Sequence, residues 1–131
     1  MPAQRGLVPV VADLTDVASV RRALGRLPRL DAAVMYAPLA DQVVHQMLCA
    51  AVDGPIVELL TSRWADPSRG DVALDDLSSG GTALLLGWSR LPSGASRWHS
   101  PTEISDAALE VLSTGRPRQL GAVRPWSDRP G

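Results

Sequence analysis

Short apolar runs alternate with amphipathic segments along this 131-residue chain, and this alternation constrains the fold more than any other feature. The apolar runs are typical of buried strands; they span 7–13, 30–37, 56–62, 82–88 and 120–124. Helical spacing of apolar side chains marks three segments, 16–27, 39–52 and 100–115. Strands that alternate with helices favour a parallel sheet. The sequence therefore predicts one α/β domain over 1–131, with three layers and a mainly parallel sheet of about five strands.

Capping residues and loop composition place the element boundaries. Thr15 or Asp16 is the expected N-cap of the first helix. Ser100-Pro101-Thr102-Glu103 has the spacing of a capping box, with proline at the favoured first helical position. The Asp/Gly/Ser-rich stretch 64–81 predicts a long loop with one helical turn near 72–77, and 89–100 predicts a second loop.

Composition excludes several classes of function. The 13 basic residues, all arginine, balance 14 acidic ones, so there is no net basic charge for nucleic acid. With no lysine, the chain cannot form a Schiff base, hold pyridoxal phosphate through lysine or supply a P-loop lysine. Cys49 is the single cysteine and cannot form an internal disulfide. No apolar run has the roughly 18 residues of a membrane helix, and no signal peptide is visible. We expect a cytoplasmic protein with no membrane partner.

Four segments resemble, in order, parts of a short-chain dehydrogenase/reductase. Residues 13–16 (Asp-Leu-Thr-Asp) match the Asp-x-Thr-Asp-like element of that family, and 36–38 (Tyr-Ala-Pro) stand where it has Asn-Ala-Gly. Residues 54–62 resemble the strand that carries the family's catalytic serine. Residues 99–112 and then 119–126 resemble its closing helix and last strand. The resemblance covers most of the chain in pieces, and it implies a small Rossmann-like fold.

The chain departs from this family where a nicotinamide would be seated and used. It has no glycine-rich dinucleotide loop, and the family's Tyr-x-x-x-Lys pair cannot exist without lysine. What the resemblance carries over is Asp13, at the adenine-contacting position, and Thr61 or Ser62 near the catalytic serine. We therefore expect no NAD(P)-dependent oxidoreductase activity and no cofactor.

The resemblance also predicts a partner. In a doubly wound sheet the two earliest strands lie in the middle, and this chain has no counterpart of them. Either 7–13 pairs directly with 30–37 or a second chain fills the gap. Because exposed sheet edges promote association, we expect a homodimer or a complex with a reductase-like protein.

Aromatic and arginine side chains follow the predicted strands, at the sheet edge where ligands of open α/β folds bind. These predicted ligand-binding residues are Tyr36, Arg63, Trp64, Trp88, Arg90, Trp98 and Trp126. One interpretation is a pocket for a flat or aromatic small molecule, with Arg63, Arg90 or Arg97 pairing an acidic group. The alternative is that the tryptophans close the core or form a dimer interface.

Three residues are candidate proton carriers: His99, Tyr36 and Asp66. The unperturbed pKa of histidine suits His99 to general acid–base chemistry, although a residue just before a helix N-cap is more often structural. Asp66 belongs to an acidic loop with Asp71, Asp75 and Asp76, whose spacing lacks the oxygen-ligand density of a calcium site.

Two further constellations are weaker. His45 and Cys49 are spaced i, i+4, which suits a metal pair, but no third ligand is near in sequence, so we expect no metal site. Thr61 or Ser62 lacks a nucleophile elbow, since no Gly-x-Ser-x-Gly occurs.

The favoured hypothesis is a non-redox, reductase-like protein that binds a small, aromatic molecule and catalyses an isomerisation, cyclisation or dehydration in a biosynthetic pathway. The alternative is a non-catalytic accessory subunit that pairs with an active reductase or another enzyme. A small α/β regulatory domain unrelated to the reductases is the third hypothesis.

Overall fold

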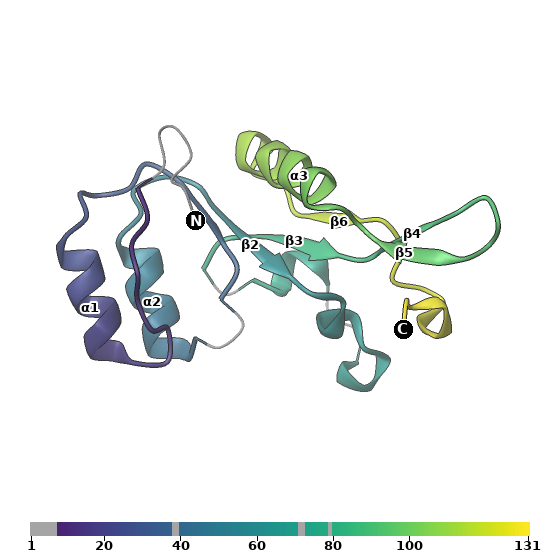
Figure 1. Cartoon of the computed structure of the whole chain (residues 1–131), viewed down its shortest axis with the longest axis horizontal. Helices are drawn as coiled ribbons and strands as arrows, with labels where there is room; N and C mark the ends of the chain where they lie inside the picture. Colours follow the sequence, from purple (N-terminus) through teal and green to yellow (C-terminus); the bar gives the residue numbers. More distant parts are fainter. Residues whose placement is uncertain (1–7, 38–39, 71–72, 79) are drawn as a thin grey trace.

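A four-stranded parallel sheet forms the centre of the molecule (Figure 1). The computed structural model describes residues 8–37, 40–70, 73–78 and 80–131. The sheet has the order β1-β2-β3-β6, and its strands are β1 (Ala33–Met35), β2 (Ile56–Leu60), β3 (Thr82–Leu86) and β6 (Arg118–Leu120). All three pairings are parallel. The prediction of an α/β fold with a mainly parallel sheet is confirmed, but that sheet has four strands rather than about five.

The three predicted helices are present, and each has a side-chain cap at its N-terminus; the cap of the second helix, Asp41, was not predicted. They are α1 (Val17–Gly25), α2 (Gln42–Ala50) and α3 (Pro101–Thr114). The Asp16 carboxylate accepts a hydrogen bond from the Ala18 amide, and the Asp41 carboxylate accepts one from the Val44 amide. The capping box of Ser100 and Glu103 forms as predicted, and Gly115 ends α3 with a left-handed φ of 68°. Side-chain caps therefore fix where each helix begins.

The strand predicted over 7–13 is wrong for the described residues, 8–13, which belong to no strand. Val8 and Val11 are 82% and 96% exposed. Pro9 has no amide to donate to a sheet, and the Asp13 carboxylate accepts hydrogen bonds from the amide and hydroxyl of Thr15, which turns the chain into α1. The same bonds lower the pKa of Asp13. The segment is apolar, but in the described structure it pairs with no strand and leaves the outer edge of β1 unpaired.

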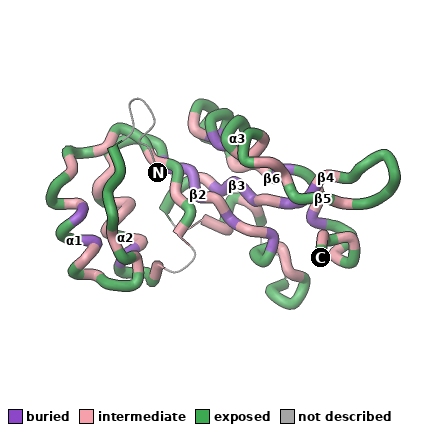
Figure 2. The backbone as a smooth tube through the Cα atoms, viewed as in Figure 1, coloured by how far each residue is buried: buried purple, intermediate pink, exposed green. Residues whose placement is uncertain are grey.

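Each face of the sheet has its own core. Figure 2 shows buried residues along the central strands β2 and β3. Alternation along β3 sends Leu84 into a cluster under α3, with Val57, Ala108 and Val111, while Leu85 points to the other face. There Leu85 packs in a cluster with Leu60, Ala83, Trp88 and Val123. Among the described residues, this second cluster contains no side chain of an α-helix; the partly buried Leu74, Leu77 and Trp126 pack against it.

These closing side chains come from or adjoin 3-10 helices, three of which lie in or overlap the predicted long loop 64–81. They are η1 (Ser62–Ala65), η2 (Pro67–Arg69), η3 (Leu74–Asp76) and η4 (Trp126–Asp128). The helical turn expected near 72–77 corresponds to η3.

The predicted loop 89–100 contains an antiparallel hairpin, so that prediction is wrong. Its strands are β4 (Trp88–Arg90) and β5 (Ser96–Trp98), with Trp88 paired to Trp98. The Leu91 amide donates to the Ala95 carbonyl at 2.7 Å, and Gly94 turns the chain with a φ of 89°. Pro92, Ser93 and Gly94 lie in the turn of this hairpin, whereas Ser89 and Ser96 lie in its strands.

Leu7, Pro38, Leu39 and Asp71, which entered the predictions above, lie outside the described residues. Within the described part of the chain, no helix is long and apolar enough to cross a membrane.

Candidate functional site

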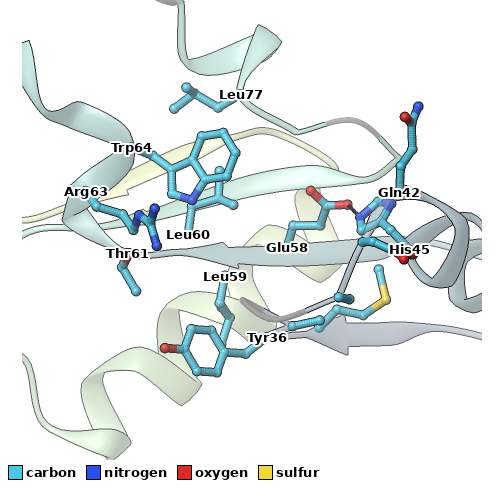
Figure 3. A pocket seen from close by; sticks show the side chains of 14 residues that line it. Tyr36, Gln42, His45, Glu58, Leu59, Leu60, Thr61, Arg63, Trp64 and Leu77 are labelled. Carbon is cyan, nitrogen blue, oxygen red and sulfur yellow. Dashed lines mark hydrogen bonds and ion pairs between the residues drawn. The ribbon is translucent and has the colours of Figure 1, made fainter. Parts of the chain in front are cut away.

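A cavity of about 340 Å³ opens where β1 and β2 end. Met35 and Tyr36 line it from the end of β1, and Thr61, Arg63 and Trp64 line it from the segment after β2 (Figure 3). Ligand pockets in proteins commonly have volumes of roughly 300 to 1,000 Å³. The cavity therefore has room for a small organic molecule, and it lies at the sheet edge that the sequence predicted.

Two exposed aromatic rings border this cavity. Tyr36 is 55% exposed and Trp64 is 39% exposed. Leu59 adds apolar wall beside Tyr36, and Leu60 and Leu77 add it on the Trp64 side of β2 (Figure 3). The Arg69 guanidinium lies 5.0 Å from the centre of the Trp64 ring, a cation–π contact that holds the indole in place. Aromatic and apolar walls of this kind suit a flat ligand.

The ends of the cavity differ in charge. The exposed Arg63 lies at one end, and Glu58 and His45 face each other at the other (Figure 3). Glu58 is only 6% exposed although it carries a carboxylate. Its two oxygens are occupied by His45 Nε2 and by the Ser78 hydroxyl, which donates at 2.6 Å. A buried carboxylate is stable only when it is paired in this way.

Cys49 lies one helical turn after His45 on α2, with its Sγ 3.8 Å from His45 Nδ1. Burial, reinforced by the Glu58 charge, raises the pKa of the Cys49 thiol above its ordinary value. Cys49 is not among the residues that line the cavity. A protonated thiol is a poor nucleophile, so the environment of Cys49 is not that of an activated cysteine.

The structure brings together three of the nine predicted site residues. Tyr36, Arg63 and Trp64 line the cavity, whereas Asp66 does not. The Asp66 carboxylate instead accepts a hydrogen bond from the Ser68 amide at the start of η2, which lowers the pKa of Asp66.

The other five predicted residues gather around the hairpin, away from the cavity lining. Trp88 is fully buried, and its ring centre lies 6.1 Å from that of Trp98 and 6.2 Å from that of Trp126. Edge-to-face packing of this kind is typical of a core, which is the alternative that the sequence left open. Arg90 is ion-paired with Asp128.

His99 also belongs to this second group. Its side chain is 7% exposed, with Nδ1 3.3 Å from a Glu103 oxygen. Within the described residues, its buried Nε2 has no hydrogen-bond partner, and neither does Trp88 Nε1. Arg97 pairs with the other Glu103 oxygen at 2.8 Å. His99 and Tyr36 are therefore not brought to one site.

Sequence reasoning missed Glu58, and it left His45 without a role. Glu58 interrupts the apolar run 56–60, and a charged residue in a strand expected to be buried is the signal that could have revealed it. Its pairing with His45 and Ser78 depends on the packing of α2 and of the η3 segment over β2, which no spacing in the sequence encodes.

No match to this chain was found among protein-family models, curated proteins or solved structures. The case for function therefore depends on the geometry of the site.

Proposed function

We propose that this protein binds a small, flat organic acid in the cavity at the ends of β1 and β2. The observation that carries the proposal is the cavity itself, which has two exposed aromatic rings and an arginine on its wall. Tyr36 and Trp64 supply surfaces for a flat ring. Arg63 supplies a fixed positive charge with the fork geometry that suits a carboxylate or phosphate.

The polar end of the cavity supports a proton-transfer reaction on the bound molecule. His45 offers an imidazole of the kind that serves as a general acid or base, and Glu58 orients its ring. Tyr36 adds a phenol that lines the cavity from the end of β1, on the other side of β2 (Figure 3). Isomerisation, cyclisation and dehydration need only proton carriers and positioning, so this set of residues fits the non-redox chemistry expected from the sequence. Hydride transfer remains disfavoured because the chain has no lysine to complete a reductase-like pair.

Calorimetric titration with a naphthalene carboxylate tests the proposal, with the uncharged methyl ester of the same acid as the comparison ligand. We expect saturable binding of the acid at one site per chain. Trp64→Leu should weaken both ligands at least about tenfold, while Arg63→Gln should weaken the acid and spare the ester. If Trp64→Leu and Arg63→Gln both bound the acid as tightly as the parent, the cavity would not be its binding site.

Matched control variants separate the cavity from other exposed side chains. Trp98→Leu removes an indole of similar exposure, 43% against 39% for Trp64, but on the hairpin. Arg116→Gln removes an exposed arginine between α3 and β6. Both controls should bind the acid like the parent.

A second candidate function, that of an accessory subunit, is favoured by the free edge of β1. Within the described residues, no strand pairs with the outer edge of β1, and Val34 in its centre is 45% exposed. Light scattering on the purified chain checks this candidate. A dimer at micromolar concentration, or a co-purifying reductase-like protein, would support it, and a monomer that purifies alone would exclude it.

A further inference from the structure

One compact group of metal-ligand side chains stands beside the cavity. In the described part of the chain, one group of side chains could share a metal ion, and it consists of His45, Cys49 and Glu58. Each offers one ligand atom, and these three atoms lie within 4.8 Å of one another. The i, i+4 spacing of His45 and Cys49 places them on one face of α2. Glu58 faces them from β2, 13 residues after His45, and is the third ligand that the sequence did not reveal.

Charge balance at Glu58 favours a cation at this position. The carboxylate is buried, and within the described residues its ion-pair partner is His45, which is charged only when protonated. The second oxygen is held by Ser78, a neutral hydroxyl. A metal ion bound between Glu58 and His45 would compensate the buried negative charge without requiring a protonated imidazole.

The backbone over the group is shaped to leave room for it. A side chain at Gly80 would place its Cβ 2.7 Å from Cys49 Sγ and 3.1 Å from His45 Cε1. The next residue, Gly81, donates its amide to the Ser78 hydroxyl at 3.0 Å, and Ser78 in turn holds Glu58. Glycine at position 80 thus allows the chain to pass close to the thiol and the imidazole.

We propose that His45, Cys49 and Glu58 bind one Zn²⁺ ion. Imidazole nitrogen, thiolate sulfur and carboxylate oxygen are the ligand types of protein zinc sites, whereas Ca²⁺ and Mg²⁺ prefer oxygen alone. Ligand atoms of a tetrahedral zinc site lie roughly 3 to 4 Å apart, so the 3.8 Å between Sγ and Nδ1 already fits.

Binding requires a limited rearrangement. The imidazole now stands between the thiol and the carboxylate, so it turns to give one nitrogen to the ion, and the Cys49 thiol releases its proton to solvent. Three protein ligands leave the fourth position open, and this position faces the cavity because both His45 and Glu58 line it. The ion would therefore be accessible to a bound ligand.

Titration of the tag-free, full-length chain with Zn²⁺ alone tests the site, and this test is independent of the proposed function because no organic ligand is present. We expect one Zn²⁺ per chain. Cys49→Ser, His45→Gln and Glu58→Gln should each lower the affinity at least about tenfold. His99→Gln, which removes the other histidine, and Glu110→Gln, which removes an exposed carboxylate, should leave it unchanged.

The spectrum of the parent chain loaded with Co²⁺ gives a second readout, and this readout requires no variant. The parent chain loaded with Co²⁺ should show a thiolate-to-metal charge-transfer band in the near ultraviolet and the intense visible bands of tetrahedral cobalt. The charge-transfer band should be missing in Cys49→Ser. A parent spectrum without the thiolate band, or no stoichiometric Zn²⁺ uptake, would overturn the proposal.

Discussion

The Ser78 hydroxyl donates a 2.6 Å hydrogen bond to the buried carboxylate of Glu58, a residue 20 positions earlier in the chain. This bond joins the segment after η3 to the centre of β2, on the face where α2 also packs. It thereby fixes the polar end of the cavity.

Ser78→Ala should destabilise the fold by about 1 to 3 kcal/mol, because the variant leaves one oxygen of a buried carboxylate without its donor. Urea denaturation at about pH 7 measures the change. Ser93→Ala is the control, since the Ser93 hydroxyl accepts only a long, exposed bond of 3.4 Å from the Ala95 amide. That control should stay within about 0.5 kcal/mol of the parent. Equal effects of the two substitutions would mean that the Glu58 bond contributes nothing.

Gly121→Ala should destabilise the fold by about 3 kcal/mol or more. Gly121 has a φ of 76°, and a Cβ there would meet His99 Nε2 and, at 2.5 Å, the Trp88 carbonyl oxygen. Gly94→Ala is the matched comparison, because Gly94 has a φ of 89° but open space around it. Gly94→Ala should destabilise the fold by only about 1 to 2 kcal/mol, because of backbone strain. Thermal unfolding of both variants compares them, and similar losses would contradict the close packing of His99 and Trp88 at this position.

Glu103→Gln should make stability less dependent on pH in acid. Its hydrogen bond to Arg97, together with those to the Ser100 amide and to His99, holds the pKa of Glu103 well below its ordinary value of 4.5. A depressed folded-state pKa contributes stability above 4.5, and this contribution is lost as the pH falls toward the folded-state value. Glutamine keeps the capping box but carries no charge, so the variant isolates the charge effect.

Denaturant unfolding at about pH 6 and about pH 3 checks this expectation. The free energy of unfolding of the parent should fall more from about pH 6 to about pH 3 than that of Glu103→Gln, because only the parent has the Glu103 charge. Other carboxylates, such as Asp13 and Asp53, contribute equally to both proteins. Parallel losses in the two proteins would show that the Glu103 charge does not stabilise the start of α3.

Asp41→Ala should destabilise the protein by about 1 kcal/mol, because it removes the N-cap of the helix that carries His45 and Cys49. Asp41→Asn keeps an oxygen that can accept from the Val44 amide and should have little effect. Circular dichroism during urea unfolding compares the two variants. Asparagine and alanine behaving alike would mean that the cap does not fix the start of α2.

The elements that the sequence predicted well are those encoded locally. The capping box at Ser100 and Glu103 and the stop at Gly115 depend on residues within one turn of each other. The apolar runs that became β2 and β3 are buried on both faces, so their composition alone marks them as strands.

The errors have physical causes that lie outside any local window. Residues 8–13 are apolar, but a strand also requires pairing, and this segment, with Pro9 and the turn at Asp13 and Thr15, pairs with no strand in the described structure. The hairpin was missed because each of its strands is only three residues long, too short for a clear strand pattern. Trp126 is distant in the chain and reaches Trp88 only through packing. The tryptophans expected at a ligand site therefore split between the cavity and the cluster around the hairpin.

A crystal structure with the naphthalene carboxylate bound tests the central claim most directly. We predict that the aromatic rings lie against Trp64, with the carboxylate within hydrogen-bond distance of Arg63. Density for the ligand at Trp98 and Trp126 instead, or an unchanged cavity under saturating ligand, would contradict it.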